Sequence, residues 1–157
     1  VCQTADCTPI LLWDEENRAI AAIHSGWRGT VQNIVEATVS RMADVYGTRP
    51  SLLRAAIGPS ISPANYRVGP EVVAGFEGFP DDQDILSVRD GEGGAQLDVA
   101  AACVFQLGET GIPAGQIWRS DLCTYAEDTR LFSARRSHHQ GQSGVFGGQG
   151  GVIGLRH

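Results

Sequence analysis

Two short segments of the chain hold the side chains best suited to chemistry. They are residues 4–7 (TADC) and residues 24–29 (HSGWRG). The thiolate of Cys7 and the imidazole of His24 are ligands that Zn²⁺ or copper accepts. The same two groups could equally act as a cysteine nucleophile with a histidine base. Cys7 and His24 are therefore candidate metal ligands and candidate catalytic residues, and the residue types alone leave both interpretations open.

The residues that follow His24 favour an anion next to this pair. Gly26 and Gly29 allow the backbone to approach a ligand closely, and Arg28 lies between them. A helix is expected from residue 30, and its first N–H groups would point back toward the site, where they favour negative charge. Arg28 is thus a candidate catalytic and substrate-binding residue.

Two ligands do not complete a zinc site, because catalytic zinc usually has three protein ligands and a water. His138 and His139 are the candidates for a third ligand. Neighbouring residues of a regular element point apart, so at most one of them would reach the same ion. Their alternative role is that of solvated surface histidines.

Three other residues could contact a substrate. Arg135 and Arg136 could clamp a phosphate or carboxylate, although an exposed arginine pair is often only solvated. Cys123 is a candidate nucleophile or substrate contact, with a core thiol as the alternative. Cys103 lies on the apolar face of a predicted helix and is expected in the core.

The composition excludes several mechanisms. The 157 residues carry a net charge of −6, and all 12 basic residues are arginines. Without lysine there is no Walker-A loop and no Schiff-base chemistry, so phosphate recognition depends on arginines and backbone N–H groups. The acidic balance argues against nucleic acid as a partner. No apolar run approaches the roughly 20 residues that cross a bilayer. The irregular cysteine spacing favours reduced thiols and a cytoplasmic location.

The elements that must position these residues form one α/β domain over residues 1–157. Strands over residues 8–13 and 18–24 predict a hairpin that brings Cys7 and His24 together. The long helices are expected over residues 30–46 and 97–107, and a shorter one opens at Pro70. Further strands are predicted over residues 52–57, 85–88, 116–119, 130–134 and 152–155.

The motifs resemble those of a known family. TADC and HSGWRG are followed in order by IGPSI (57–61), YRVGPEV (66–72), DLCTY (121–125) and LFSARR (131–136). This series is similar to the YfiH-like family, also called the laccase-domain or multicopper polyphenol oxidoreductase family and, in bacteria, the peptidoglycan editing factor. The resemblance implies helices packed on mixed β-sheets, a fold likened to the catalytic domain of cytotoxic necrotizing factor toxins.

The resemblance also implies an activity and a set of ligands. Family members are understood as zinc-dependent enzymes that phosphorolyse purine nucleosides and deaminate adenosine, so a nucleoside and phosphate are the expected partners. The family's metal site uses two histidines and a cysteine, of which the cysteine corresponds to Cys7 and one histidine to His24. The other histidine belongs to an upstream Val-His-Gly motif that nothing here matches, so about the first third of the family core is expected to be missing. Gln142 stands where the family has an arginine.

Three alternatives remain at this stage. The first is a Cys7–His24 hydrolase acting on peptidoglycan precursors. The second is a copper polyphenol oxidase, although laccase chemistry needs several coppers and the chain has 4 histidines. The third is an inactive truncated core, whose N-terminal edge strand could pair with another chain and give a homo-oligomer.

Overall fold

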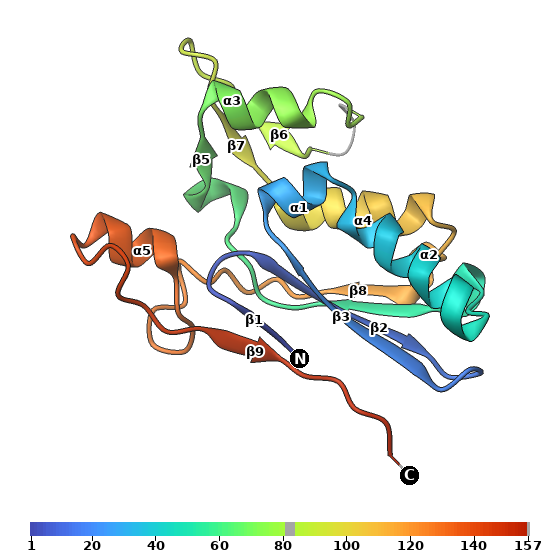
Figure 1. The fold of residues 1–157 in the computed structure, drawn as a ribbon. Helices are drawn as coiled ribbons and strands as arrows, with labels where there is room; N and C mark the ends of the chain where they lie inside the picture. The colour runs from blue at the N-terminus through green and yellow to red at the C-terminus, as the bar shows by residue number, and fades with distance from the viewer. Residues whose placement is uncertain (81–83, 157) are drawn as a thin grey trace.

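A mixed four-stranded sheet forms the centre of the computed structural model, which describes residues 1–80 and 84–156 (Figure 1). The strand order is β3-β2-β4-β8, with β3 and β4 antiparallel to β2 and β8 parallel to β4. The strands are β2 (Thr8–Asp14), β3 (Ala19–Ser25), β4 (Arg54–Ile57) and β8 (Ile117–Arg119). The predicted hairpin of β2 and β3 is therefore confirmed.

Three helices cover one face of this sheet (Figure 1). They are α1 (Trp27–Val31), α2 (Ile34–Tyr46) and α4 (Val99–Glu109). Beneath them lie the alternate β2 residues Ile10 and Leu12, which are fully buried with Val35 of α2. Each such side chain contributes about 1.5–3 kcal/mol through the area it removes from water. Among the described residues, no helix has the length and apolar character needed to cross a membrane.

The single helix predicted over residues 30–46 is wrong in one respect, since the structure divides it into α1 and α2. Asn33 lies between them with φ 55° and ψ 46°, the left-handed conformation. Left-handed backbone cannot continue a right-handed helix, and asparagine tolerates it better than most residues. The first helix also begins earlier than predicted, at Trp27, directly after Gly26.

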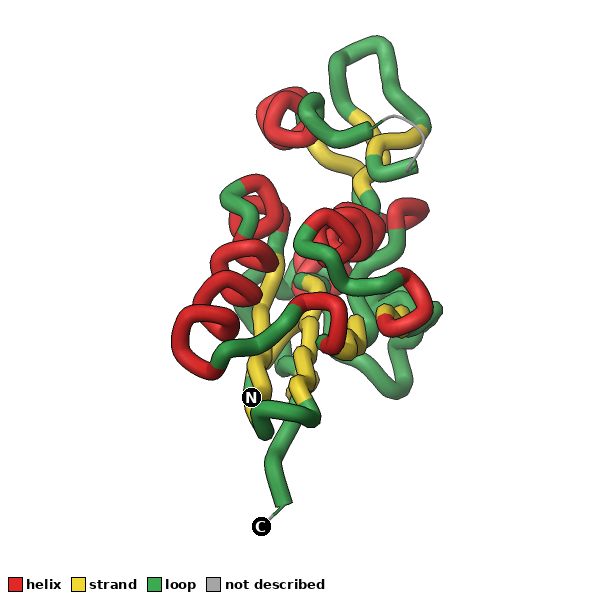
Figure 2. The backbone as a smooth tube through the Cα atoms, turned by 90° about the vertical axis from the view of Figure 1, so that its right-hand side faces the viewer, coloured by secondary structure: helices red, strands yellow, loops and turns green. Residues whose placement is uncertain are grey.

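A smaller three-stranded sheet lies at one end of the molecule, apart from the central sheet in both views (Figure 2). It contains β5 (Arg67–Val68), β7 (Ala95–Leu97) and β6 (Leu86–Ser87), in that order. The chain between β5 and β6 forms α3 (Pro70–Val73) and a 3₁₀ turn, Ala74–Phe76. Further 3₁₀ turns are Pro50–Leu52, Pro63–Asn65 and Ala114–Gln116.

The two ends of the chain pack on the other face of the central sheet. There β1 (Cys2–Thr4) pairs with β9 (Gln149–Gly151), and a Cβ built at Gly151 would lie 3.6 Å from both Leu11 and Pro9. The strand predicted over residues 152–155 is wrong: the ladder ends at Cys2↔Gly151 because β1 begins at Cys2.

The strand predicted over residues 130–134 is also wrong. Residues 128–130 form a turn, and the helix α5 (Ala134–His139) begins in its place. The physical reason is the N-cap, because the Ser133 hydroxyl accepts a hydrogen bond from the Arg136 N–H at 3.1 Å. This contact satisfies an N–H that the first turn of a helix leaves unpaired.

Candidate functional site

The β2–β3 register places Cys7 and His24 on the same face of the hairpin. Thr8 pairs with Ser25 and Pro9 with His24, so Cys7 lies opposite Gly26. A Cβ built at Gly26 would lie only 2.9 Å from the Cys7 sulfur, which shows that the thiol packs against this glycine. Cys7 and His24 are thus diagonal cross-strand neighbours, whose side chains start about 7 Å apart.

Two hydrogen bonds fix the turn that carries Gly26. The Ser25 and Thr30 hydroxyls are 2.8 Å apart, and the Thr30 hydroxyl is also 3.0 Å from the Gly26 carbonyl oxygen. Both Ser25 and Thr30 are fully buried. The turn therefore joins β3 to α1 rigidly and holds Gly26 against the thiol of Cys7.

Arg28 is exposed on α1, and its guanidinium lies 4.3 Å from the ring centroid of its neighbour Trp27. The predicted anion site depended on both this arginine and the start of a long helix. Because α1 has only 5 residues, its peptide dipoles sum to little. Anion binding here would depend on the Arg28 side chain.

Tyr66 is a site residue that no spacing pattern in the sequence predicts. Burial raises the pKa of Tyr66, and the negative charges of Cys7 and Asp6 raise it further, whereas Arg135 and Arg28 act to lower it. The Arg135 guanidinium carbon lies 5.0 Å from the Tyr66 ring centroid. The phenol is therefore close to the thiol of Cys7 and to two of the predicted cationic residues.

Asp6 is a second residue that the motif contained but the residue types did not single out. Its carboxylate accepts hydrogen bonds from the Thr124 hydroxyl at 2.6 Å and from the Arg135 N–H at 2.7 Å. Its carbonyl oxygen accepts a third, from the Ile61 N–H at 3.0 Å. Asp6 is buried and has a φ of 93°. It ties the segment before Cys7 to the Cys123–Tyr125 segment and to the first turn of α5.

The adjacent arginines Arg135 and Arg136 have different surroundings. The Arg136 guanidinium donates to the carbonyl oxygens of Thr124, Tyr125 and Leu131 at 2.7, 2.8 and 2.5 Å. Arg135 donates through Nη1 to the Arg67 carbonyl oxygen at 3.0 Å, which leaves its other N–H groups for a ligand. Arg136 therefore holds the loop before α5 together. To contact a substrate as predicted, its guanidinium would have to share its N–H groups between these carbonyl oxygens and the substrate.

The histidines of α5 do not join Cys7 and His24. His138 Nδ1 lies 2.6 Å from the Ser143 hydroxyl, and His139 Nδ1 lies 3.0 Å from the Tyr125 hydroxyl. Across residues 1–80 and 84–156, no group of three His, Cys, Asp or Glu side chains could hold a metal ion. The suggestion that His138 or His139 is the third ligand is therefore wrong for the described chain, and His157 lies outside it.

Cys123 and Cys103 have opposite electrostatic environments. Burial acts to raise the pKa of Cys123, but hydrogen bonds outweigh it, and the pKa falls below its ordinary value of 9.0. The hydrogen bonds that lower it come from Ser62, whose N–H lies 3.3 Å from the sulfur, and from the backbone N–H groups of Ala126 and Tyr125. The Asn65 side-chain amide also donates to this sulfur at 3.5 Å. Burial raises the pKa of Cys103 to about 11, and this side chain is in the core as predicted.

We expect these environments to decide which of the two cysteines is alkylated first in the native protein. Iodoacetamide should modify Cys123 at least about tenfold faster than Cys103, because the thiolate is the nucleophile and only Cys123 is both accessible and stabilised as thiolate. The Cys123 rate should also reach its plateau at a lower pH than that of a free cysteine. Peptide mass spectrometry over a pH series measures both rates. Equal rates in the folded protein would contradict the assignment, and equal rates in urea are the control.

The known proteins most relevant to this site carry nucleoside-enzyme names. A purine nucleoside phosphorylase of Bacteroides thetaiotaomicron is 44% identical over 134 residues, which cover 85% of this chain and 50% of that protein. A protein named adenosine deaminase RL5, from an unknown prokaryotic organism, is 40% identical over 134 residues, 85% of this chain and 51% of that protein. The chain thus spans about half the length of the curated relatives it matches.

The fold comparison agrees with the sequence comparison. The crystal structure of the Bacillus licheniformis hypothetical protein YfiH matches with a TM-score of 0.83 at 30% identity, over 93% of this chain and 54% of that one. YlmD of Geobacillus stearothermophilus matches with a TM-score of 0.82 at 31% identity, over 93% and 53%. The predicted α/β class, with helices on mixed sheets, is confirmed. Residues 1–156 match the family described as multi-copper polyphenol oxidoreductase laccase, and the chain belongs to this laccase-like, YfiH-related family.

Proposed function

We propose that this chain forms part of the catalytic site of a zinc-dependent purine nucleoside phosphorylase that also deaminates adenosine. The observation that carries the proposal is the pairing of Pro9 with His24, which sets Cys7 and His24 on one face of the hairpin. Tyr66 lies near the same thiol, and the Arg135 guanidinium lies against the Tyr66 ring. The names of the relatives support the choice of reaction.

The donor set fits zinc in type but not in number. A thiolate and an imidazole are common zinc ligands, and a catalytic zinc has three protein ligands. The described residues offer no group of three. We therefore propose that Cys7 and His24 supply two ligands and that a residue outside the described part of the chain supplies the third. A zinc ion held there would provide Lewis acidity toward the substrate.

The residues of this chain would bind and orient the substrates. In phosphorolysis a phosphate oxygen bonds to C1′ of the ribose while the bond from C1′ to the base nitrogen breaks. Since the chain has no lysine, Arg28 and Arg135 are the cations proposed to hold this phosphate. The raised pKa of Tyr66 keeps its hydroxyl protonated at neutral pH, so it can donate a hydrogen bond to the nucleoside.

Arg136 and Cys123 were predicted to touch substrate, and we now propose a positioning role for both. The Cys123 sulfur accepts hydrogen bonds from Ser62 and Asn65. Ser62 precedes the 3₁₀ turn Pro63–Asn65, and Asn65 ends it directly before Tyr66. Arg136 binds the carbonyl oxygens of Thr124 and Tyr125. Together they fix the loops that carry Tyr66 and the Asp6 partner Thr124.

The test combines metal analysis with product analysis for the wild type and Cys7→Ser. Purified protein is incubated with adenosine and phosphate, and we expect adenine and ribose 1-phosphate from phosphorolysis and inosine from deamination. Cys7→Ser should lose bound zinc and both activities together, whereas the core variant Cys103→Ala should keep them. Full turnover by Cys7→Ser without zinc would overturn the metal assignment.

Two further measurements separate the other two enzyme hypotheses. Copper in place of zinc, with oxidation of a phenol, would favour the polyphenol oxidase that the family's description suggests. Metal-independent modification of Cys7 by a thiol-alkylating amide analogue would favour the Cys7–His24 hydrolase. Burial and the nearby Asp6 raise the pKa of Cys7, which disfavours a metal-free thiolate nucleophile.

A further inference from the structure

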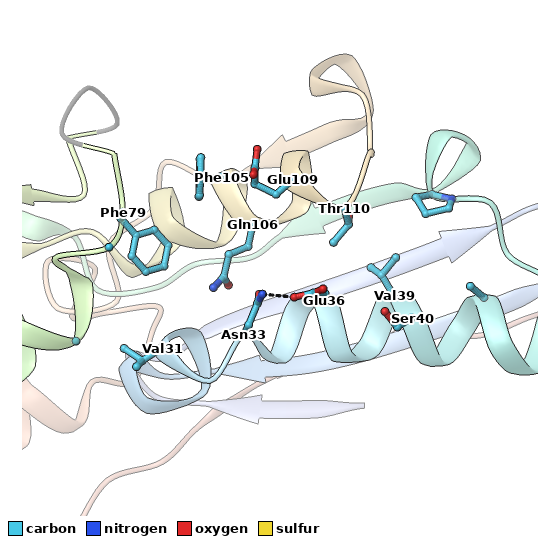
Figure 3. Close-up of a pocket in the computed structure, with 14 residues that line it drawn as sticks. Val31, Asn33, Glu36, Val39, Ser40, Phe79, Phe105, Gln106, Glu109 and Thr110 are labelled. Carbon is cyan, nitrogen blue, oxygen red and sulfur yellow. Dashed lines mark hydrogen bonds between the residues drawn. The ribbon is translucent and has the colours of Figure 1, made fainter.

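A groove on the helical side of the central sheet has the dimensions of a ligand site and lies outside the site described above. It has a volume of about 750 Å³ and is bounded mainly by α2, α4 and the chain near Phe79 (Figure 3). Ligand-binding pockets commonly measure about 300–1,000 Å³. His24 lies on the opposite face of β3, so the groove and the proposed catalytic site are separate.

Gln106 presents an unpartnered acceptor to this groove. The residue is 7% exposed, and its side-chain nitrogen donates to the Thr30 carbonyl oxygen at 2.7 Å. That bond fixes which end of the amide is nitrogen, because a carbonyl can only accept. The buried Gln106 Oε1 has no hydrogen-bond partner among the residues that the structure describes. An unpaired buried acceptor of this kind costs about 1–3 kcal/mol.

Asn33 supplies a second acceptor of the same kind. Its side-chain nitrogen donates to a carboxylate oxygen of Glu36, which again fixes the amide orientation. Asn33 Oδ1 is buried and, within residues 1–80 and 84–156, has no partner either. Figure 3 shows the side chains of Gln106 and Asn33 pointing toward each other from α4 and from the break before α2. The two amides thus meet at the same part of the groove, and each has a buried oxygen without a donor among the described residues.

The remaining walls of the groove define the charge and shape of a complementary ligand. Its lining includes the carboxylates of Glu36 and Glu109, and no arginine or histidine is among the described lining residues. Phe79 and Phe105 form an aromatic wall, with ring centroids 5.8 Å apart in an edge-to-face arrangement. Aromatic rings and carboxylates both favour a cation, and unpaired acceptors favour N–H donors.

We propose that this groove binds a planar organic cation with N–H donors on an apolar body, such as an amidinium or guanidinium compound. On binding, the Gln106 and Asn33 side-chain amides shift and uncover their buried oxygens. The N–H groups of the ligand then donate to Gln106 Oε1 and Asn33 Oδ1, the charge lies near Glu36 and Glu109, and the apolar body packs on Phe79 and Phe105. The proposal is independent of the zinc site and of any nucleoside activity.

The probe is benzamidine, with benzoate as the anion of matched shape. Two-dimensional ¹⁵N–¹H NMR of the 157-residue chain follows the side-chain amides of Gln106 and Asn33 during each titration. We expect saturable shifts of these two amides with benzamidine below about 20 mM, and none with benzoate. A groove that holds only water would give no saturable shift, and equal binding of benzoate would remove the charge argument. Either result would overturn the proposal.

Two variants test the contacts without disturbing the fold. Asn33→Gly removes the acceptor and retains the left-handed backbone, and it should weaken benzamidine binding by about tenfold. Glu109→Gln keeps the shape and removes one exposed charge, and about threefold weaker binding is expected. The control Glu71→Gln, on α3 outside the groove, should bind as the wild type does. Unchanged affinity in Asn33→Gly would show that the probe binds elsewhere.

Discussion

Replacing Asp6 by alanine is expected to lower the free energy of unfolding by about 3 kcal/mol, since hydrogen bonds to a charged group contribute about 1.5–3 kcal/mol each. The substitution leaves the buried Thr124 hydroxyl and the Arg135 N–H without an acceptor. Chemical denaturation measures the loss. Because Asp6 joins three segments, the amide signals of Cys123 and of the first turn of α5 should shift as well.

Asparagine and glycine at this position separate the possible causes. In Asp6→Asn the side-chain oxygen can still accept from the Arg135 N–H, and the amide can donate to the Thr124 hydroxyl, so a loss of less than about 1 kcal/mol is expected. Asp6→Gly loses both bonds but relieves the φ of 93°, and should be more stable than the alanine variant by about 1 kcal/mol.

The exposed Asp128 provides the control, because it has no ion pair within the described chain. Asp128→Ala should change stability by less than about 0.5 kcal/mol. If Asp6→Ala were as mild as this control, the carboxylate would not be the link between the three segments.

The pair of Cys7 and His24 was predictable because its placement depends on local pattern. Two short apolar segments on either side of a charged turn predict a hairpin, and a hairpin brings its two open ends together. In the structure Ile10 and Ile23 pair across this hairpin and are both buried. Once the register is set, the face of each residue follows, and His24 lies on the face away from the helices.

Tyr66, Asp6 and Arg136 were not predictable in their roles, because each acts through contacts between distant segments. Asp6 and Arg135 are 129 residues apart in sequence, and no periodic pattern relates them. The strand predicted over residues 130–134 failed for a similar reason. Its residue types tolerate an extended chain, but the Ser133 cap and the Asp6 carboxylate together satisfy the first N–H groups of a helix.

The break at Asn33 shows how a local rule can be overridden. The apolar spacing continues through residues 31–35, so periodicity alone predicts one helix. The structure instead places Asn33 in the left-handed region and starts α2 at Ile34. The break also places Asn33 in the lining of the groove, where its side-chain oxygen is buried without a hydrogen-bond partner in the described part of the chain.

Gly26→Ala is expected to reduce zinc affinity and turnover by about 10- to 100-fold, the size typical for losing the support of a metal ligand. The new Cβ would lie 2.9 Å from the Cys7 sulfur, so the thiol must move away from its present position. The backbone itself offers no obstacle, since Gly26 has a φ of −86° that any residue adopts. The variant should therefore fold and yet bind metal poorly, which zinc titration and thermal unfolding measure together.

A double-mutant cycle shows whether the effect acts through the sulfur. In a Cys7→Ala background there is no sulfur to displace, so adding Gly26→Ala should change the weak residual zinc affinity, measured at high zinc concentration, by less than about twofold. Gly108→Ala, at a glycine with nothing within 4 Å of an added Cβ, is the matched control and should retain full affinity. Additive losses in the cycle would mean that Gly26 contacts the ligand itself, and that the 2.9 Å approach to Cys7 is not what makes glycine necessary there. A non-additive result would tie the glycine of the HSGWRG segment to the cysteine of the TADC segment as one metal-binding unit.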